Sequence, residues 1–407
     1  MTRRLFTTLC GLVFLVNMGR VAFAPLVPEF QQELGISAAA VGSVTSLVWI
    51  GTAAPRIPVG WVLTRVARER VVVATGVALA VASAFTATTD SLLGLQAGAF
   101  AVGLSTGGYF VAAIPLIGKL YPDATGRAVG IHGTASQVAS VLAPALVLGV
   151  IAQAGDWRVV FGLLAVGAAV STASLVVVVR RREDVRSDTS GDPNDAEPDG
   201  GVESRNFRAA LSHWRIVLAG MSLVAVSGFA WQGVFNFYVS YLLSEGLTPA
   251  NANFLLTVAF AAGVPAFWLG GRLADRLPKV PYLLALNAAF LVSLVALTFA
   301  GSLASFAVVS ALIGYAAHAL FPAVDTYMLS TLPAPDRASA YAVFSGTALL
   351  FEANGSGVVG ALTDAGLAFD WVFRLFAAGV ALILVVTGAL YLAGRFPTPP
   401  DDRRVQP

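Results

Sequence analysis

The stretch that decides the fold reads GRLADRLPK at residues 271–279, and a related stretch, GWVLTRVARER, occupies residues 60–70. Both are short basic segments that begin with glycine, and each follows a long apolar run. When the apolar runs are counted within each half of the chain, both segments come directly after the second run. A basic segment at the same position in both halves predicts a membrane protein built from internal repeats.

The composition supports a membrane protein. Apolar residues make up 57% of the 407 residues and charged residues 12%, whereas a soluble domain carries about 25% charged residues. Several apolar runs reach the length of about 20 residues that spans a bilayer. The single cysteine, Cys10, lies in the first run, so there is no disulfide framework or cysteine metal site.

The pattern predicts an all-α polytopic fold of twelve transmembrane helices in two six-helix pseudo-repeats. The domains are an N-terminal half at 1–180, a linker at 181–213, a C-terminal half at 214–394 and a tail at 395–407. The linker is rich in charged residues, Ser, Gly and Pro, and we expect it to be mobile. The expected spans are about 5–28, 37–63, 70–89, 91–119, 127–153, 157–180, 214–243, 249–274, 280–300, 303–331, 338–363 and 370–394.

Basic residues predict the orientation. If the N-terminus is cytoplasmic, 21 of the 25 Lys and Arg fall on the inner side, and only Arg158 and Arg374 fall in outer loops. We therefore expect a multi-pass protein of the plasma membrane with both termini and the linker in the cytoplasm. The chain has no phosphate-binding loop and no dinucleotide fingerprint. We expect a monomer in the lipid bilayer with no cofactor, no catalytic residues, no metal and no nucleic-acid partner.

The basic loops carry a resemblance to a known family. The chain resembles the major facilitator superfamily over essentially its whole length, through the loop motif G-x-L-A-D-R-x-G-R-K. The second copy matches at residues 271–276 and Lys279, while the first copy has Thr64 in place of the acid and Ala67 in place of the loop glycine. This resemblance implies a secondary transporter, driven by ion gradients, whose inner loops latch the two halves together. The gating residues expected are Arg56, Gly60, Arg65, Arg68, Gly271, Asp275, Arg276, Asp325 and Arg337.

The first span contains Arg20, about 15 residues from its start, in the segment NMGRVAFAP at 17–25. An ionisable side chain inside a span costs about 2.5–3.5 kcal/mol on insertion scales. A guanidinium suits bidentate capture of a carboxylate or phosphate, although it could instead snorkel to the outer headgroups or pair with Glu29 or Glu33. The segment is similar to that of the anion:cation symporter group, which implies anion contact at Arg20. Gly19 stands where that group has an acid.

The second span contains Arg56 in a setting, RIPVG at 56–60, that resembles nitrate/nitrite porters. Those porters carry a matching arginine in the eighth span, which is missing from PAFWLGG at 265–271. An inner-gate pair or snorkelling toward the headgroups would also explain Arg56.

A third group of ionisable residues lies in the second half. Glu352 is close to the middle of its span, where burial favours the neutral carboxyl; it is the proton-coupling candidate, or else a structural partner of an arginine. His318 titrates near physiological pH and either lines the cavity and assists Glu352 or packs as a neutral side chain. Asp325 is expected in a salt bridge with Arg276 or Arg337. His132 is expected at the inner membrane interface.

The resemblance also implies which side chains line the cavity, because spans one, four, seven and ten do so in this superfamily. Aromatic walls with a few polar groups are typical of small-ligand sites, although each residue could simply pack. The expected substrate-binding residues are Asn17, Arg20, Tyr109, Trp231, Gln232, Asn236, Tyr315 and His318.

Together these features predict a secondary active transporter that moves a small organic anion, coupled to protons, by alternating access. A proton-coupled drug or metabolite exporter is the main alternative, although the fifth-span proline at 144 lacks the neighbouring glycines that such exporters carry. A nitrate/nitrite porter, a membrane sensor and a membrane enzyme are further alternatives. The sensor would need a signalling domain and the enzyme a catalytic cluster, and neither is visible in the sequence.

Overall fold

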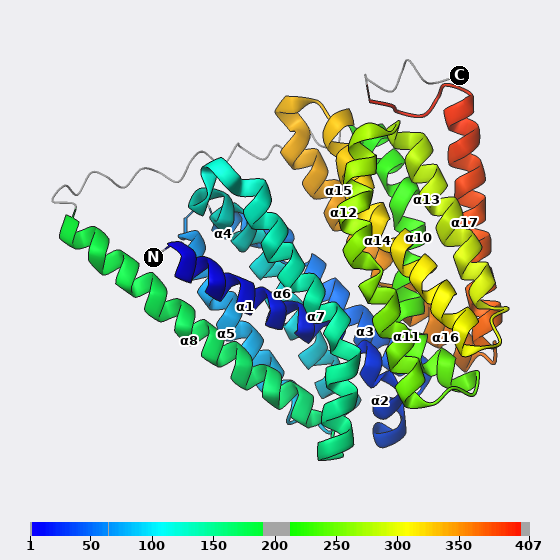
Figure 1. Ribbon diagram of the computed structural model, residues 1–407, viewed down its shortest axis with the longest axis horizontal. Coiled ribbons are helices and arrows are strands. Elements are labelled where there is room, and N and C mark those ends of the chain that lie inside the picture. The colour runs from blue at the N-terminus through cyan, green and yellow to red at the C-terminus, as the bar shows by residue number, and fades with distance from the viewer. Residues whose placement is uncertain (1, 64, 190–211, 400–407) are drawn as a thin grey trace. The chain divides into compact units, whose positions relative to one another are not determined.

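The computed structural model describes residues 2–63, 65–189 and 212–399. Within these ranges the regular structure is helical (Figure 1). The chain divides into two compact units. Unit 1 consists of Met1–Ala22, Leu47–Ser140 and Gly149–Arg205, and unit 2 consists of Phe23–Ser46, Val141–Leu148 and Asn206–Pro407.

Unit 1 is a helical bundle in which α1, α5, α6 and α8 pack on one another (Figure 1). Each spanning helix of this unit buries one apolar face against neighbouring helices and exposes other apolar side chains on its outer face. Exposed apolar side chains are expected of helices that face lipid. The helices that lie wholly or partly in this unit are α1 (Thr2–Val21), α3 (Ala38–Ala53), α4 (Arg56–Val62), α5 (Arg68–Thr86), α6 (Leu92–Leu120), η2 (Pro122–Ala124), α7 (Thr125–Ala154) and α8 (Arg158–Thr189).

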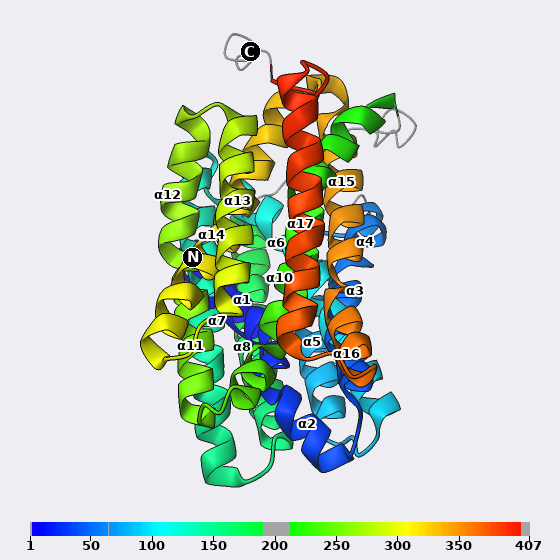
Figure 2. The ribbon, with the colours of Figure 1, turned by 90° about the vertical axis from the view of Figure 1, so that its right-hand side faces the viewer.

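Unit 2 is built around α10 and α14, and Figure 2 shows α17 beside α13 on one side of this unit. Its helices are η1 (Ala24–Leu26), α2 (Val27–Leu34), α10 (Trp214–Ser244), α11 (Pro249–Ala261), α12 (Gly263–Arg276), α13 (Lys279–Leu297), α14 (Leu303–Thr331), η3 (Ala334–Asp336), α15 (Arg337–Glu352), α16 (Gly355–Asp364) and α17 (Phe369–Leu392).

The number of spans agrees with the sequence. Among the described residues, eleven helical segments are long and apolar enough to cross a membrane. The remaining span, the eleventh in chain order, is α15 with α16, which are separated by a break at residues 353–354. Helix α8 continues to Thr189, nine residues beyond the predicted end at 180, and most of the predicted linker lies outside the described residues.

The breaks repeat between the halves. The second span is broken between α3 and α4 at Pro55, and the eighth is broken between α11 and α12 just before Pro265. Proline lacks the N–H that would continue the helix ladder and clashes with the preceding turn. The helix starts repeat as well, because Ser91 and Ser302 cap α6 and α14 by accepting hydrogen bonds from backbone N–H groups. These two serines are as far apart in sequence as Gly60 and Gly271.

The two arginines of the predicted outer loops have matching structural roles. Arg158 donates to the carbonyl of Thr89 at 3.2 Å and pairs with Asp90 at 2.6 Å. Arg374 donates to the carbonyl and the hydroxyl of Thr298 at 3.1 and 3.0 Å. Both therefore fix the loop that follows the third helix of their half, which gives each exception to the charge bias a structural reason.

Unit 2 also contains a segment from the first two spans, residues 23–46. The carboxylate of Asp364 accepts hydrogen bonds from the backbone N–H groups of Ala38 and Ala39, both at 2.9 Å, at the start of α3. The backbone N–H of Gly357 donates to Ser46 at 3.1 Å. A Cβ added at Gly360 would lie 2.1 Å from the Ala38 carbonyl oxygen, so glycine is required for this close approach.

Candidate functional site

Arg20 lies in the last turn of α1, where the negative end of the helix dipole favours a cation. One of its terminal nitrogens donates to Oδ1 of Asn17, one turn earlier. The guanidinium carbon lies 4.4 Å from the centre of the Trp49 ring and 5.8 Å from that of Phe110. The cation is thus held between a polar side chain and two aromatic rings.

Asn17 is itself fixed from the other side. Its amide nitrogen donates to the carbonyl of Ser136 and to the hydroxyl of Ser140, each at 2.7 Å, on α7. Both the amide nitrogen and Oδ1 of Asn17 therefore have hydrogen-bond partners. The contacts with α7 fix the amide group, and the fixed Oδ1 orients Arg20. Direct contact of Asn17 with a substrate stays a prediction.

The Nε–H of Arg20 is buried and has no hydrogen-bond partner. No carboxylate of unit 1 forms an ion pair with Arg20 among the described residues. A buried donor without a partner costs about 1–3 kcal/mol, and more when it is charged. An anion placed beside Nε would remove this cost, which makes Arg20 a candidate for anion binding.

A second guanidinium lies nearby. Arg56 is the first residue of α4, directly after the break at Pro55, and it is close enough for its charge to act on that of Arg20. Two positive charges of one helical bundle repel each other strongly in a medium of low dielectric constant. An anion bound near Arg20 would lower that repulsion.

Tyr109 of α6 is fully buried. Its hydroxyl donates to the carbonyl of Leu9 at 2.9 Å and lies 2.9 Å from Nε2 of His132, whose ring stacks on that of Tyr109. His132 is buried against α6. Its expected place at the inner membrane interface stays a prediction. The Tyr109 hydroxyl already has these two hydrogen-bond partners. Contact between Tyr109 and a substrate stays a prediction.

Unit 2 holds His318 inside an aromatic cluster. Its Nδ1 lies 2.7 Å from the Gly314 carbonyl, which can only accept, so Nδ1 carries a proton. The rings of Trp231, Phe260 and Phe267 meet the imidazole edge to face at 5.4–6.1 Å. The structure thus brings together Trp231 and His318, two of the predicted binding residues.

Glu352 is the last residue of α15 and is buried. Its carboxyl group lies where a side chain at Gly228 of α10 would otherwise be, since a Cβ there would be 2.4 Å from the carboxyl carbon. The break at residues 353–354 follows directly. A buried carboxyl beside a helix break is chemically suited to binding and releasing a proton.

The remaining predicted lining residues lie in two environments. Asn236 donates to Ser356 and to the carbonyl of Gln232, both at 2.8 Å, while Oε1 of Gln232 is buried without a hydrogen-bond partner. Gln232 therefore has an acceptor that a substrate hydroxyl or amide could use. Tyr315 packs against the apolar core of unit 2, near Tyr282.

The predicted gating residues lie at helix ends. Arg65 stacks on Trp61 and the exposed Arg272 stacks on Trp268, each guanidinium within 4 Å of a ring centre, so the two loops share this feature as well. Asp325 accepts a hydrogen bond from Tyr341 at 2.6 Å, and Arg337 donates to the carbonyl of Leu332. Roles in gating for these residues, and for Gly60, Arg68, Gly271, Asp275 and Arg276, stay predictions.

Unit 1 also contains an apolar cavity that none of the predicted gating residues lines. This cavity of about 560 Å³ runs between α1 and α7, lined mainly by apolar side chains with Thr7 and Thr134. Among the described residues, no group of three or more His, Cys, Asp or Glu side chains could hold a metal ion.

Spanning helices in two repeated sets, with buried charges inside the bundles, define a polytopic membrane transporter. The chain belongs to the Major Facilitator Superfamily, whose family model matches residues 9–281 and 220–407. The predicted family and the predicted all-α fold of twelve spanning helices are therefore confirmed. The finer likeness to the anion:cation symporter group stays a prediction.

Similar proteins include a curated relative, the probable sulfoacetate transporter SauU of Cupriavidus necator. It is 26% identical over 277 residues, which cover 67% of this chain and 64% of the relative, just under two thirds of its length.

Solved structures show the same fold. A bacterial homologue of the human lysosomal transporter Spinster, inward-facing and occupied, has a TM-score of 0.75 at 18% identity, with 98% of this chain and 97% of that chain covered. A mutant of the peptide transporter POT, in complex with sulfate, has a TM-score of 0.72 at 16% identity, with 96% of this chain and 94% of that chain covered.

Proposed function

We propose that this transporter moves a small organic anion across the membrane and that Arg20 binds its anionic group. The observation that carries the proposal is the buried Nε–H of Arg20, which has no protein partner while the rest of the guanidinium is held by Asn17 and Trp49. An anion oxygen at Nε would form a charge-assisted hydrogen bond, which is about twice as strong as a neutral one. Arg56 adds a second positive charge.

The curated relative supports this substrate class. It is named as a probable transporter of sulfoacetate, an organic anion. We infer that the present chain takes a substrate of the same broad class, a small molecule with at least one carboxylate or sulfonate group. The aromatic rings of Trp49 and Phe110 would then cover the apolar part of such a molecule.

We further propose that transport is coupled to protons through Glu352, with His318 assisting. Both side chains are buried in unit 2 and both can exchange a proton. Alternating access would expose the carboxyl of Glu352 to each side in turn. It would also require the contacts between residues 23–46 and α16 to break and re-form during the cycle.

The location and topology belong to the same proposal. We propose that the protein lies in the plasma membrane. The distribution of Lys and Arg favours an orientation with both termini in the cytoplasm. The chain would act as a monomer.

Uptake into proteoliposomes tests this proposal. We expect accumulation of labelled sulfoacetate or a related carboxylate when the outside is acidic, and little accumulation without a pH gradient. Neutral sugars and cationic dyes serve as controls and should not accumulate. Transport of the cations, with no uptake of any organic anion, would contradict the proposal and favour the exporter alternative.

A further inference from the structure

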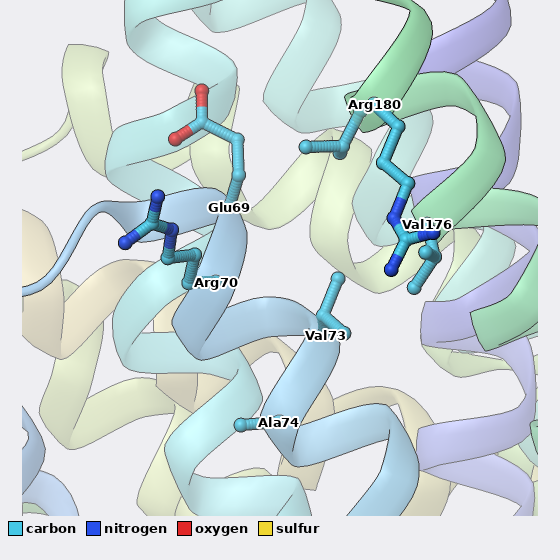
Figure 3. A pocket seen from close by; sticks show the side chains of 7 residues that line it. Glu69, Arg70, Val73, Ala74, Val176 and Arg180 are labelled. Atoms are coloured by element: carbon cyan, nitrogen blue, oxygen red, sulfur yellow. The ribbon is translucent and has the colours of Figure 1, made fainter. Parts of the chain in front are cut away.

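Unit 1 also contains a cavity with charged lining residues, and Arg20 is not among them. It has a volume of about 270 Å³ and lies between α5 and α8, with Arg70 and Glu69 from one helix and Arg180 from the other (Figure 3). Its other lining residues are Val73, Ala74, Val176 and Val179. Figure 3 shows the Arg180 guanidinium turned back along α8 toward Val176.

The helix packing explains why the cavity forms here. Helices α5 and α8 pack side by side, and they approach closely at Gly76, where an added Cβ would lie 2.3 Å from the hydroxyl of Thr172. Arg70 lies six residues before that point and Arg180 eight residues after Thr172, which is about 9 and 12 Å along the helix axes. The cavity therefore lies on the basic side of this close approach, between the ends of α5 and α8 that carry Arg70 and Arg180.

The charges of the lining favour an anion with one negative charge. Two guanidinium groups and one carboxylate in the lining give it a net charge of +1. A phosphodiester carries one negative charge and accepts the fork-shaped hydrogen bonds of arginine well. The Glu69 carboxylate can accept a hydrogen bond from a hydroxyl group attached to that phosphodiester.

The rest of the cavity favours a molecule with an acyl chain. Below the arginines the walls are valine and alanine side chains, and the adjoining surface is apolar and exposed, with Val77 50% and Val177 49% accessible. Such a surface faces lipid in a spanning helix. Basic pockets between transmembrane helices on the side rich in Lys and Arg are suited to anionic headgroups.

We propose that this cavity binds one anionic phospholipid of the phosphatidylglycerol type, with its phosphodiester at Arg180 and its acyl chains along the valines of α5 and α8. The Arg70 guanidinium points away from Arg180 in Figure 3 and would turn toward the phosphodiester when the lipid binds. The lipid would join α5 to α8 at the ends that carry Arg70 and Arg180. This site is independent of the substrate proposal, because it lies outside the Arg20 region and its occupancy can be measured without transport.

Native mass spectrometry of the full chain tests the proposal after release from bilayers with equal phosphatidylglycerol and phosphatidylcholine. We expect one phosphatidylglycerol retained in preference to phosphatidylcholine. Arg70→Gln and Arg180→Gln should each lower that preference about fivefold, the ratio that corresponds to about 1 kcal/mol per basic residue near a membrane surface. Ala74→Phe fills the cavity without changing any charge and should abolish the preference.

Arg127→Gln is the matched control, because Arg127 is an exposed arginine on α7 of the same unit, outside the cavity. It should leave the preference unchanged. An equal loss in this control, or an unchanged preference in Ala74→Phe, would mean that only general surface charge attracts the lipid, and the site would be refuted. Complete displacement of the lipid by inorganic phosphate would assign the cavity to a free anion and would also overturn the proposal.

Discussion

Replacing Arg20 by Lys separates the shape of the cation from its charge. Lysine keeps the positive charge and can still lie over the ring of Trp49, which is 4.4 Å from the guanidinium carbon in the native chain. It loses the Nε–H that has no protein partner and the second N–H of the fork. The hydrogen bond to Asn17 would also have to be made by a single ammonium group.

The expected effect follows from the number of hydrogen bonds lost. A hydrogen bond to a charged group contributes about 1.5–3 kcal/mol, and the substitution removes at least one to the substrate. The dissociation constant for the organic anion should therefore rise by roughly 10- to 150-fold. Arg20→Gln removes the charge as well and should bind more weakly still.

The assay is anion binding to purified protein by calorimetry, with the thermal unfolding midpoint measured in parallel. Arg127→Lys provides the control for an exposed arginine of the same unit. A dissociation constant within twofold of the native value in Arg20→Lys, with normal folding, would refute the assignment of Arg20 to the substrate site.

The other predictions concern coupling, packing, the loop arginines and acid. Glu352→Gln should retain anion exchange but lose the response to a pH gradient in proteoliposomes. If transport by this variant is still driven by a pH gradient, Glu352 is not the residue that couples transport to protons. Gly228→Ala should cost about 1–3 kcal/mol of stability because the new Cβ overlaps the Glu352 carboxyl; an unchanged unfolding midpoint would contradict that geometry. Arg374→Gln should cost about 1–3 kcal/mol by removing two hydrogen bonds to Thr298, and a hydrogen-exchange rate unchanged around this loop would argue against the contact. Hydrogen bonds from Ser37 and from backbone N–H groups hold the pKa of Asp364 below its usual range. The ionised Asp364 therefore stabilises the folded protein at every pH above the pKa of the unfolded chain, and this contribution is lost only as pH falls below about 4. Any change in transport rate between pH 5 and 8 should therefore be the same in Asp364→Asn as in the native protein.

The sequence predicted the spans well because each is a long apolar run between charged or turn-forming residues. The break of the eleventh span was not predicted, since residues 353–354 contain no proline. Its cause is tertiary, because Gly355 packs so closely on α10 that an added Cβ would lie 2.0 Å from the Phe229 carbonyl oxygen. The end of α8 was placed at 180 because charged residues begin there, but a helix can continue into polar sequence once it has left the bilayer.

The candidate site was predictable only in part. A buried charge such as Arg20 is visible in sequence because it interrupts an apolar run, but its partners Trp49 and Phe110 are ordinary apolar residues there. The partnership of Tyr109 with His132 joins two helices and has no local signal. Likewise, Arg158 and Arg374 were visible as exceptions to the charge bias, whereas their contacts with Thr89 and Thr298 depend on helix packing.

The most direct test of the central claim is a cryo-electron microscopy map of the transporter with bound sulfoacetate. We expect density for the anion with an oxygen about 3 Å from Nε of Arg20, while Asn17 keeps its contacts with α7. Anion density bound elsewhere, with Nε of Arg20 still without a partner, would contradict the account.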